Sequence, residues 1–171
     1  SKDTKIKNSE LWYNDAKEND IRGRVDEFST IDLGMKDGKP VWAAKDFDDS
    51  SWKEMELPGV WEQKGLEAVD GVVWFRKVVE VEKKDIGKPV VLNLGKINDS
   101  DNTFINGQLV GSNKLAADKS RVYTIPTELL KLGKNTIAVQ VEDVGANGGI
   151  YGDSDSLSLQ FGSRKIPLSG D

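Results

Sequence analysis

The sequence predicts an all-β sandwich built from short strands and turns. The strongest strand signal is the segment Val72–Val81, which is rich in β-branched and aromatic residues. Residues 135–141 and 157–161 alternate apolar and polar side chains with a period of two, as half-buried strands do. Turn residues recur between such segments, and no strand–helix unit repeats along the chain, which argues against a parallel sheet.

Further strands are expected around these three segments. Asn106-Gly107 is the signal of a type I′ turn, so it predicts a hairpin between residues 103–105 and 108–111. Thr127–Leu130 fits one helical turn, which Gly133 brings to an end. The remaining predicted strands are residues 90–94 and 121–125.

The first forty residues follow a different pattern. Ser9 is a favourable N-cap, and the apolar residues after it are spaced for a short helix over residues 9–20. Gly34–Pro40 is a glycine-rich connector that ends in proline. We therefore predict two parts: residues 1–40 are a lead-in segment that packs on the domain, and residues 41–171 are the β-sandwich domain.

Composition describes a globular chain without a membrane or nucleic-acid partner. Of its 171 residues, 37% are hydrophobic and 31% are charged. A domain of this size buries about 70% of the surface that its unfolded chain exposes, so it needs no disulfide or metal for stability. No apolar run approaches the ~20 residues needed to cross a membrane, and no signal peptide is recognisable at Ser1. The net charge of −5, without a clustered basic face, disfavours a nucleic acid.

The absence of histidine and cysteine excludes several kinds of active site. The chain contains no residue of either type, so it has no Ser-His-Asp triad, thiol nucleophile, disulfide or histidine-ligated metal. Two carboxylates in a cleft could still hydrolyse a glycoside, but the acidic residues here fall mostly in turns. We therefore predict that this chain is not an enzyme by itself.

Several short motifs occur at intervals along residues 42–171. They are Phe47–Trp52, Leu57-Pro58, Gly71–Arg76, the hairpin Asn106-Gly107, and Leu132–Ile137. Together they resemble the sugar-binding jelly roll of family 2 glycoside hydrolases. The resemblance implies a jelly-roll β-sandwich of the galactose-binding type.

A second set is similar to the jelly roll inserted in bacterial sialate O-acetylesterases. Its residues are Asp70–Trp74, Leu94–Asp101, Asn147–Gly152 and Ile166–Asp171. This resemblance implies an accessory domain of an esterase that removes O-acetyl groups from sialic acid. The implied partner is an SGNH-type catalytic domain of the same parent chain, and the implied location is extracytoplasmic, either periplasmic or secreted.

The block Gly152-Asp153-Ser154 superficially matches the nucleophile motif of that esterase family. We reject it as a catalytic site, because it does not follow an early strand and no histidine is present to activate Ser154. The main reading is therefore a non-catalytic accessory domain of the esterase. The alternative is an autonomous carbohydrate-binding module, or the sugar-binding domain of a family 2 glycoside hydrolase similar to β-galactosidase.

Four residues are candidates for contact with a glycan. Trp61 and Tyr151 lie in predicted loops, where their rings could stack on a sugar. Arg76 and Glu62 could bind sugar hydroxyl groups, or instead form a charged pair at the rim of the sandwich. The resemblance to family 2 also implies that Arg76 orders neighbouring loops. The other tryptophans considered, Trp42, Trp52 and Trp74, could form a stacking platform or belong to the core, with the core favoured for Trp52 and Trp74.

Asp99 and Asp101 raise the question of a structural calcium ion. Calcium prefers oxygen ligands, but the glycine and glutamate spacing of an EF-hand is missing here. The same residues fit a turn with Asx caps before the strand 103–105. The acidic loop with Asp46, Asp48 and Asp49 invites the same two interpretations. Apart from this possible calcium, no cofactor is expected.

Overall fold

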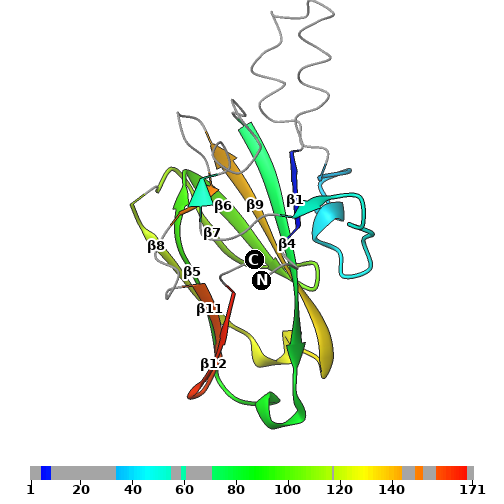
Figure 1. The fold of residues 1–171 in the computed structure, drawn as a ribbon, viewed down its shortest axis with the longest axis vertical. Coiled ribbons are helices and arrows are strands. Elements are labelled where there is room, and N and C mark those ends of the chain that lie inside the picture. The colour runs from blue at the N-terminus through cyan, green and yellow to red at the C-terminus, as the bar shows by residue number, and fades with distance from the viewer. Residues whose placement is uncertain are drawn as a thin grey trace, which may run out of the picture.

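The protein is a sandwich of two antiparallel sheets (Figure 1). The computed structural model describes residues 5–8, 34–54, 59–60, 71–116, 118–143, 149–151 and 157–168. The first sheet has the order β2 (Lys53–Glu54), β1 (Lys5–Asn8), β4 (Gly71–Val81), β9 (Gly133–Asp143), β6 (Ser100–Ile105) and β7 (Gln108–Asn113). The second has the order β12 (Arg164–Pro167), β11 (Leu157–Phe161), β5 (Val90–Asn98), β10 (Gly149–Ile150) and β3 (Gly59–Val60), and β8 (Ser120–Ile125) also pairs with β5.

This arrangement confirms the predicted fold class. The predicted hairpin is also confirmed: β6 and β7 pair, and Asn106 and Gly107 have φ values of 48° and 86°, as a type I′ turn requires. The helical turn predicted at 127–130 is the 3₁₀ turn η5 (Thr127–Leu129). The described residues also include the 3₁₀ turns η2 (Val41–Ala43) and η4 (Lys83–Asp85).

The main core lies between the two sheets. β4 pairs with β9 over its whole length, from Gly71 opposite Asp143 to Val81 opposite Gly133. Because side chains alternate along a strand, every second residue of each strand faces the second sheet. The buried side chains that meet there include Val73, Phe75, Val79, Ile137, Val139 and Val141 from the first sheet, and Leu92, Leu94, Ile97, Leu157, Leu159 and Phe161 from the second.

A smaller apolar cluster lies on the outer face of the first sheet. Trp74 of β4 is completely buried there and stacks on Phe104 of β6, with ring centroids 5.6 Å apart. The segment 34–52 covers both rings and contributes Trp52, which is also buried. The core roles expected for Trp52 and Trp74 are therefore confirmed, and the half-buried Trp42 packs against both of them.

The predicted lead-in contributes to the first sheet. Within residues 1–40, the strand β1 pairs with β4, placing Lys5 opposite Arg76 and Asn8 opposite Val73. Gly34 packs so closely on Trp74 that a Cβ atom there would lie 2.4 Å from the indole nitrogen. The helix predicted over 9–20 lies outside the described residues. Nothing within the described ranges is a helix with the length and apolarity to cross a bilayer.

Candidate functional site

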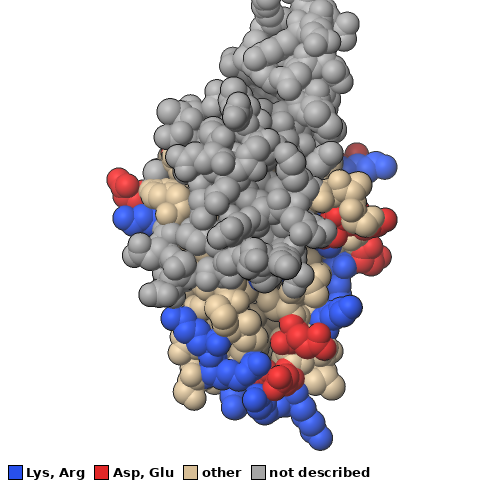
Figure 2. Space-filling view, in the orientation of Figure 1, with Lys and Arg blue, Asp and Glu red and all other residues tan. Residues whose placement is uncertain are grey.

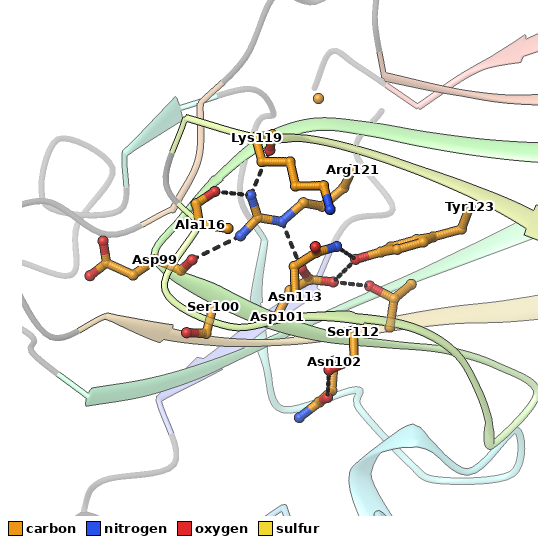
Figure 3. A network of polar contacts seen from close by, with 12 residues as sticks. Asp99, Ser100, Asp101, Asn102, Ser112, Asn113, Ala116, Lys119, Arg121 and Tyr123 are labelled. Carbon is orange, nitrogen blue, oxygen red and sulfur yellow. Dashed lines mark hydrogen bonds and ion pairs between the residues drawn. The ribbon is translucent and has the colours of Figure 1, made fainter.

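A buried ion pair joins the two sheets near the Lys114–Ser120 loop (Figure 3). Asp101 is on β6 in the first sheet and Arg121 is on β8 in the second. The Arg121 Nε atom donates to Asp101 Oδ1 at 2.7 Å, and both side chains are fully buried. A buried charge left without a partner would be strongly destabilising, so each of these residues depends on the other.

The other two nitrogen atoms of the Arg121 guanidinium donate to backbone carbonyl oxygens. Its Nη1 atom donates to the carbonyl oxygens of Lys119, at 2.6 Å, and of Ala116. Its Nη2 atom donates to the carbonyl oxygen of Asp99 at 2.8 Å. One side chain therefore fixes the loop before β8 and the turn before β6 in a single arrangement.

The second oxygen of Asp101 extends the network to Tyr123. Asp101 Oδ2 accepts hydrogen bonds from Thr103 Oγ1 and from the Tyr123 hydroxyl, each at 2.7 Å. The Tyr123 hydroxyl in turn accepts from Asn113 Nδ2 of β7 at 2.8 Å. Burial, followed by the bond to the Asp101 carboxylate, raises the pKa of the Tyr123 phenol well above its usual value, so the phenol remains a donor near neutral pH.

Gly111 makes room for the Tyr123 ring. A Cβ atom at position 111 would lie 2.3 Å from a ring carbon of Tyr123. The ring therefore packs directly on the backbone of β7, and it links the edge strand of the first sheet to β8 of the second. No sequence pattern signalled this contact, because the two residues belong to different strands and different sheets.

The calcium interpretation of Asp99 and Asp101 finds no support in this geometry. Both Asp101 oxygens already accept hydrogen bonds from protein donors, one of which is positively charged. The backbone carbonyl of Asp99 accepts from Arg121 and from the Ala116 amide. Among the described residues, no group of three or more aspartate, glutamate, histidine or cysteine residues is placed to hold a metal ion.

Arg76 of β4 binds several groups in the segment 42–49. Its side chain is only 2% exposed and lies on the outer face of β4. It donates to the Asp49 carboxylate at 2.8 Å and to the carbonyl oxygens of Trp42 and Ala44 at 2.6 and 2.9 Å. The guanidinium also lies over the Phe47 ring, 5.3 Å from its centroid. These contacts correspond to the loop-ordering alternative for Arg76, and its contact with a glycan stays a prediction.

Of the two aromatic candidates for glycan binding, Trp61 and Tyr151, only Tyr151 belongs to the described residues. It is half-buried beside β10, and its backbone amide donates to the Lys96 carbonyl at 2.9 Å. β10 places Gly149 opposite Asn98, so Tyr151 lies at the same end of β5 as the turn that Arg121 holds. Trp61, Glu62 and the Gly152–Ser154 block lie outside the described residues, so the structure does not bring Trp61 and Tyr151 together or separate them.

Two asparagines, Asn106 and Asn135, link the β6–β7 hairpin to the start of β9. Asn135 is fully buried and donates to the carbonyl oxygens of Lys131 and Gly133. The amide of Asn106 donates to Asn135 Oδ1 at 2.9 Å, which ties the Asn-Gly hairpin to the start of β9. The Asn106-Gly107 hairpin and the segment Leu132–Ile137 therefore meet in space, and the contact between them is structural.

A second ion-pair cluster lies where η4 meets the β11–β12 hairpin. Arg164 donates to Asp85 Oδ2 at 2.7 Å and lies 3.6 Å from Glu82. Figure 2 shows lysine and arginine side chains gathered at this lower end of the molecule. The exposed lysines of η4 and the following turn, Lys83, Lys84 and Lys88, belong to this region. These charged side chains surround the ion pair between Arg164 and Asp85.

The described residues offer no catalytic constellation. Both oxygens of the buried Asp101 carboxylate are bound by Arg121, Thr103 and Tyr123. The buried Arg76 and Arg121 side chains bind neighbouring backbone carbonyl oxygens.

Comparison with known proteins points to glycoside hydrolases. No protein-family profile matches the chain. It is 30% identical over 121 residues to a Formosa agariphila protein described as "Putative beta-glucuronidase", an alignment that covers 64% of this chain and 11% of that protein. A calcium-binding mutant of Bacteroides uniformis β-glucuronidase 2 is 27% identical with a TM-score of 0.57, covering 64% of this chain and 15% of the enzyme. A β-glucuronidase from glycoside hydrolase family 2, at 22% identity and a TM-score of 0.59, shows that the fold is shared.

The chain therefore resembles one domain of much larger family 2 glycosidases. It spans between 11% and 15% of the length of these three relatives. The similarity supports the family 2 alternative over the main reading, since the sialate O-acetylesterase parent finds no support in these comparisons.

Proposed function

We propose that this chain is a non-catalytic, sugar-binding-type jelly-roll domain of a family 2 glycoside hydrolase of the β-glucuronidase type. The observation that carries the proposal is the 27–30% identity to β-glucuronidases, confined to a small part of their length and joined to a shared fold. The lack of histidine and cysteine, and of a catalytic pair among the described residues, supports a role other than catalysis. The partner is then the catalytic domain of the same chain, with a glycan as that domain's substrate.

The hydrogen-bond network around Arg121 fits a non-catalytic domain that packs against a neighbouring domain. Domains within one chain meet over interfaces of roughly 600–1,500 Å², and loops at such interfaces must hold their shape. Arg121 binds the backbone carbonyl oxygens of Lys119 and Asp99 through a side chain that is fully buried. The extracytoplasmic location implied by the resemblance stays a prediction.

The test is the coding sequence on both sides of this chain, followed by an assay of the complete protein. We expect a flanking domain with two carboxylate residues in a cleft, and hydrolysis of 4-nitrophenyl β-D-glucuronide by the complete protein. The isolated chain should leave that substrate unchanged. A flanking serine-hydrolase domain that releases acetate from O-acetylated sialic acid would instead establish the esterase parent.

A further inference from the structure

Leu115 combines two unfavourable properties. Its backbone has φ = 49°, in the left-handed region that costs free energy for a residue with a branched side chain and is normally left to glycine, asparagine or aspartate. Its side chain is also 65% exposed, so burial within this domain does not offset that cost. Among the described residues, the other non-glycine positions with positive φ are Asp37 and Asn106, both of which tolerate this conformation.

The surrounding network holds this conformation in place. The Leu115 amide donates to Ser100 Oγ at 2.8 Å, and the next amide, that of Ala116, donates to the Asp99 carbonyl at 2.9 Å. Arg121 then binds the carbonyl oxygens of both Asp99 and Ala116. A strained residue persists when its surroundings over-determine it, and such residues concentrate where a surface is used for binding.

The residues around Leu115 have the character of an interface rim. Lys114, Asp118 and Lys119 are exposed and carry charges of both signs. Leu115 is an exposed apolar side chain among these charged neighbours, an arrangement that fits an interface with an apolar centre and a polar rim.

We infer that Leu115 is an anchor that inserts into an apolar pocket of the adjoining domain in the parent protein. The inference rests on the proposed function for the existence of that domain, because the matched relatives are several times longer than this chain. The Asp101–Arg121 pair is the positioning device: it fixes the backbone so that the leucine points outward. The binding partner of Leu115 is a domain of the same polypeptide rather than a second copy of this chain or a free sugar.

The test compares Leu115→Asn in the isolated chain and in the complete parent protein. Asparagine tolerates the left-handed conformation, so the isolated chain should keep its melting temperature or gain a few degrees. In the complete protein, the same change should lower the melting temperature of this domain by at least about 3 °C, because the anchor is lost. Leu132→Asn is the matched control, since Leu132 is 64% exposed and does not have a positive φ; it should shift both proteins equally.

Each other outcome decides against the anchor. An equal loss of stability in the isolated chain and the complete protein would mean that Leu115 is merely structural. No change in the complete protein would mean that Leu115 contacts no other domain. An isolated chain that dimerises in sedimentation, and loses the dimer with Leu115→Asn, would assign the leucine to a second copy. The flanking coding sequence tests the proposed function separately, so a parent of another class would leave the domain comparison valid.

Discussion

At the scale of single residues, Arg121 is the cation of the buried ion pair that joins the two sheets. It is charged, fully buried, and bonded to one carboxylate and three backbone carbonyl oxygens. Desolvation of such a group is expensive, so its contribution is best measured by removing one partner and leaving the other.

We expect Arg121→Ala to lower the free energy of unfolding by about 3–5 kcal/mol, because it leaves the Asp101 carboxylate buried without a cation. Urea denaturation followed by tryptophan fluorescence measures this change. Lys119→Ala is the control: Lys119 contributes only its backbone carbonyl to the network, so the change should be within about 0.5 kcal/mol. A loss below about 1 kcal/mol for Arg121→Ala would show that the pair is not essential to the fold.

Tyr123 gives a prediction about alkaline pH. Its pKa is raised in the folded state, first by burial and then by the bond to Asp101, whereas the unfolded chain has a phenol near pKa 10. The folded protein therefore binds the phenolic proton more tightly than the unfolded chain does. This contribution is complete below pH 10 and is lost as the pH rises above it, since the unfolded state then releases the proton first.

Comparison with Tyr123→Phe isolates the effect. At pH 7 the variant should be about 1–2 kcal/mol less stable, because Asp101 and Asn113 each lose a partner. The stability difference between the two proteins should shrink steadily between pH 10 and pH 12, measured by urea denaturation at fixed ionic strength. A difference that stays constant over this range would show that the pKa of Tyr123 is not raised.

At the scale of secondary-structure elements, the segment 41–52 has little regular structure and depends on Arg76. The guanidinium binds the carbonyl oxygens of Trp42 and Ala44 and the carboxylate of Asp49. We expect Arg76→Leu to speed hydrogen–deuterium exchange over residues 41–52 by at least tenfold, while β5 and β11 keep their protection. Arg164→Leu, which removes the pair with Asp85 at the other end, should leave exchange over 41–52 unchanged. Equal exchange over 41–52 in Arg76→Leu and the native chain would mean that the aromatic packing alone holds the segment.

Elements with strong local signals could be predicted from the sequence, and those that depend on distant partners could not. The strands around Val72–Val81 and Asn135–Val141 were expected because their composition and alternation are local properties. β1 (Lys5–Asn8) was missed because it is short and polar, and only its pairing with β4 and β2 makes it a strand. For the same reason Asp101 was considered as a metal ligand: its partner Arg121 is 20 residues away, and no sequence spacing links them.

At the scale of the whole molecule, the described residues form two packed sheets, and the chain corresponds to a small part of each relative. Its two sheets enclose a continuous apolar core, and the segment 34–52 covers a second cluster on the outer face. If the proposed function holds, sugar binding is expected to depend on a neighbouring domain, because a single open surface encloses little of a ligand.

This dependence predicts weak sugar binding by the isolated chain. A shallow, one-sided contact buries little ligand surface, so we expect dissociation constants no tighter than about 1 mM, near −4 kcal/mol, for glucuronides, galactosides and sialosides. Titration calorimetry of the isolated chain measures them, with Tyr151→Ala and Trp61→Ala as variants that should leave the weak binding unchanged. An autonomous carbohydrate-binding module would behave differently. It would bind an oligosaccharide with micromolar affinity and lose that affinity in either variant, because stacking of sugar rings on exposed aromatic side chains would then supply most of the binding free energy.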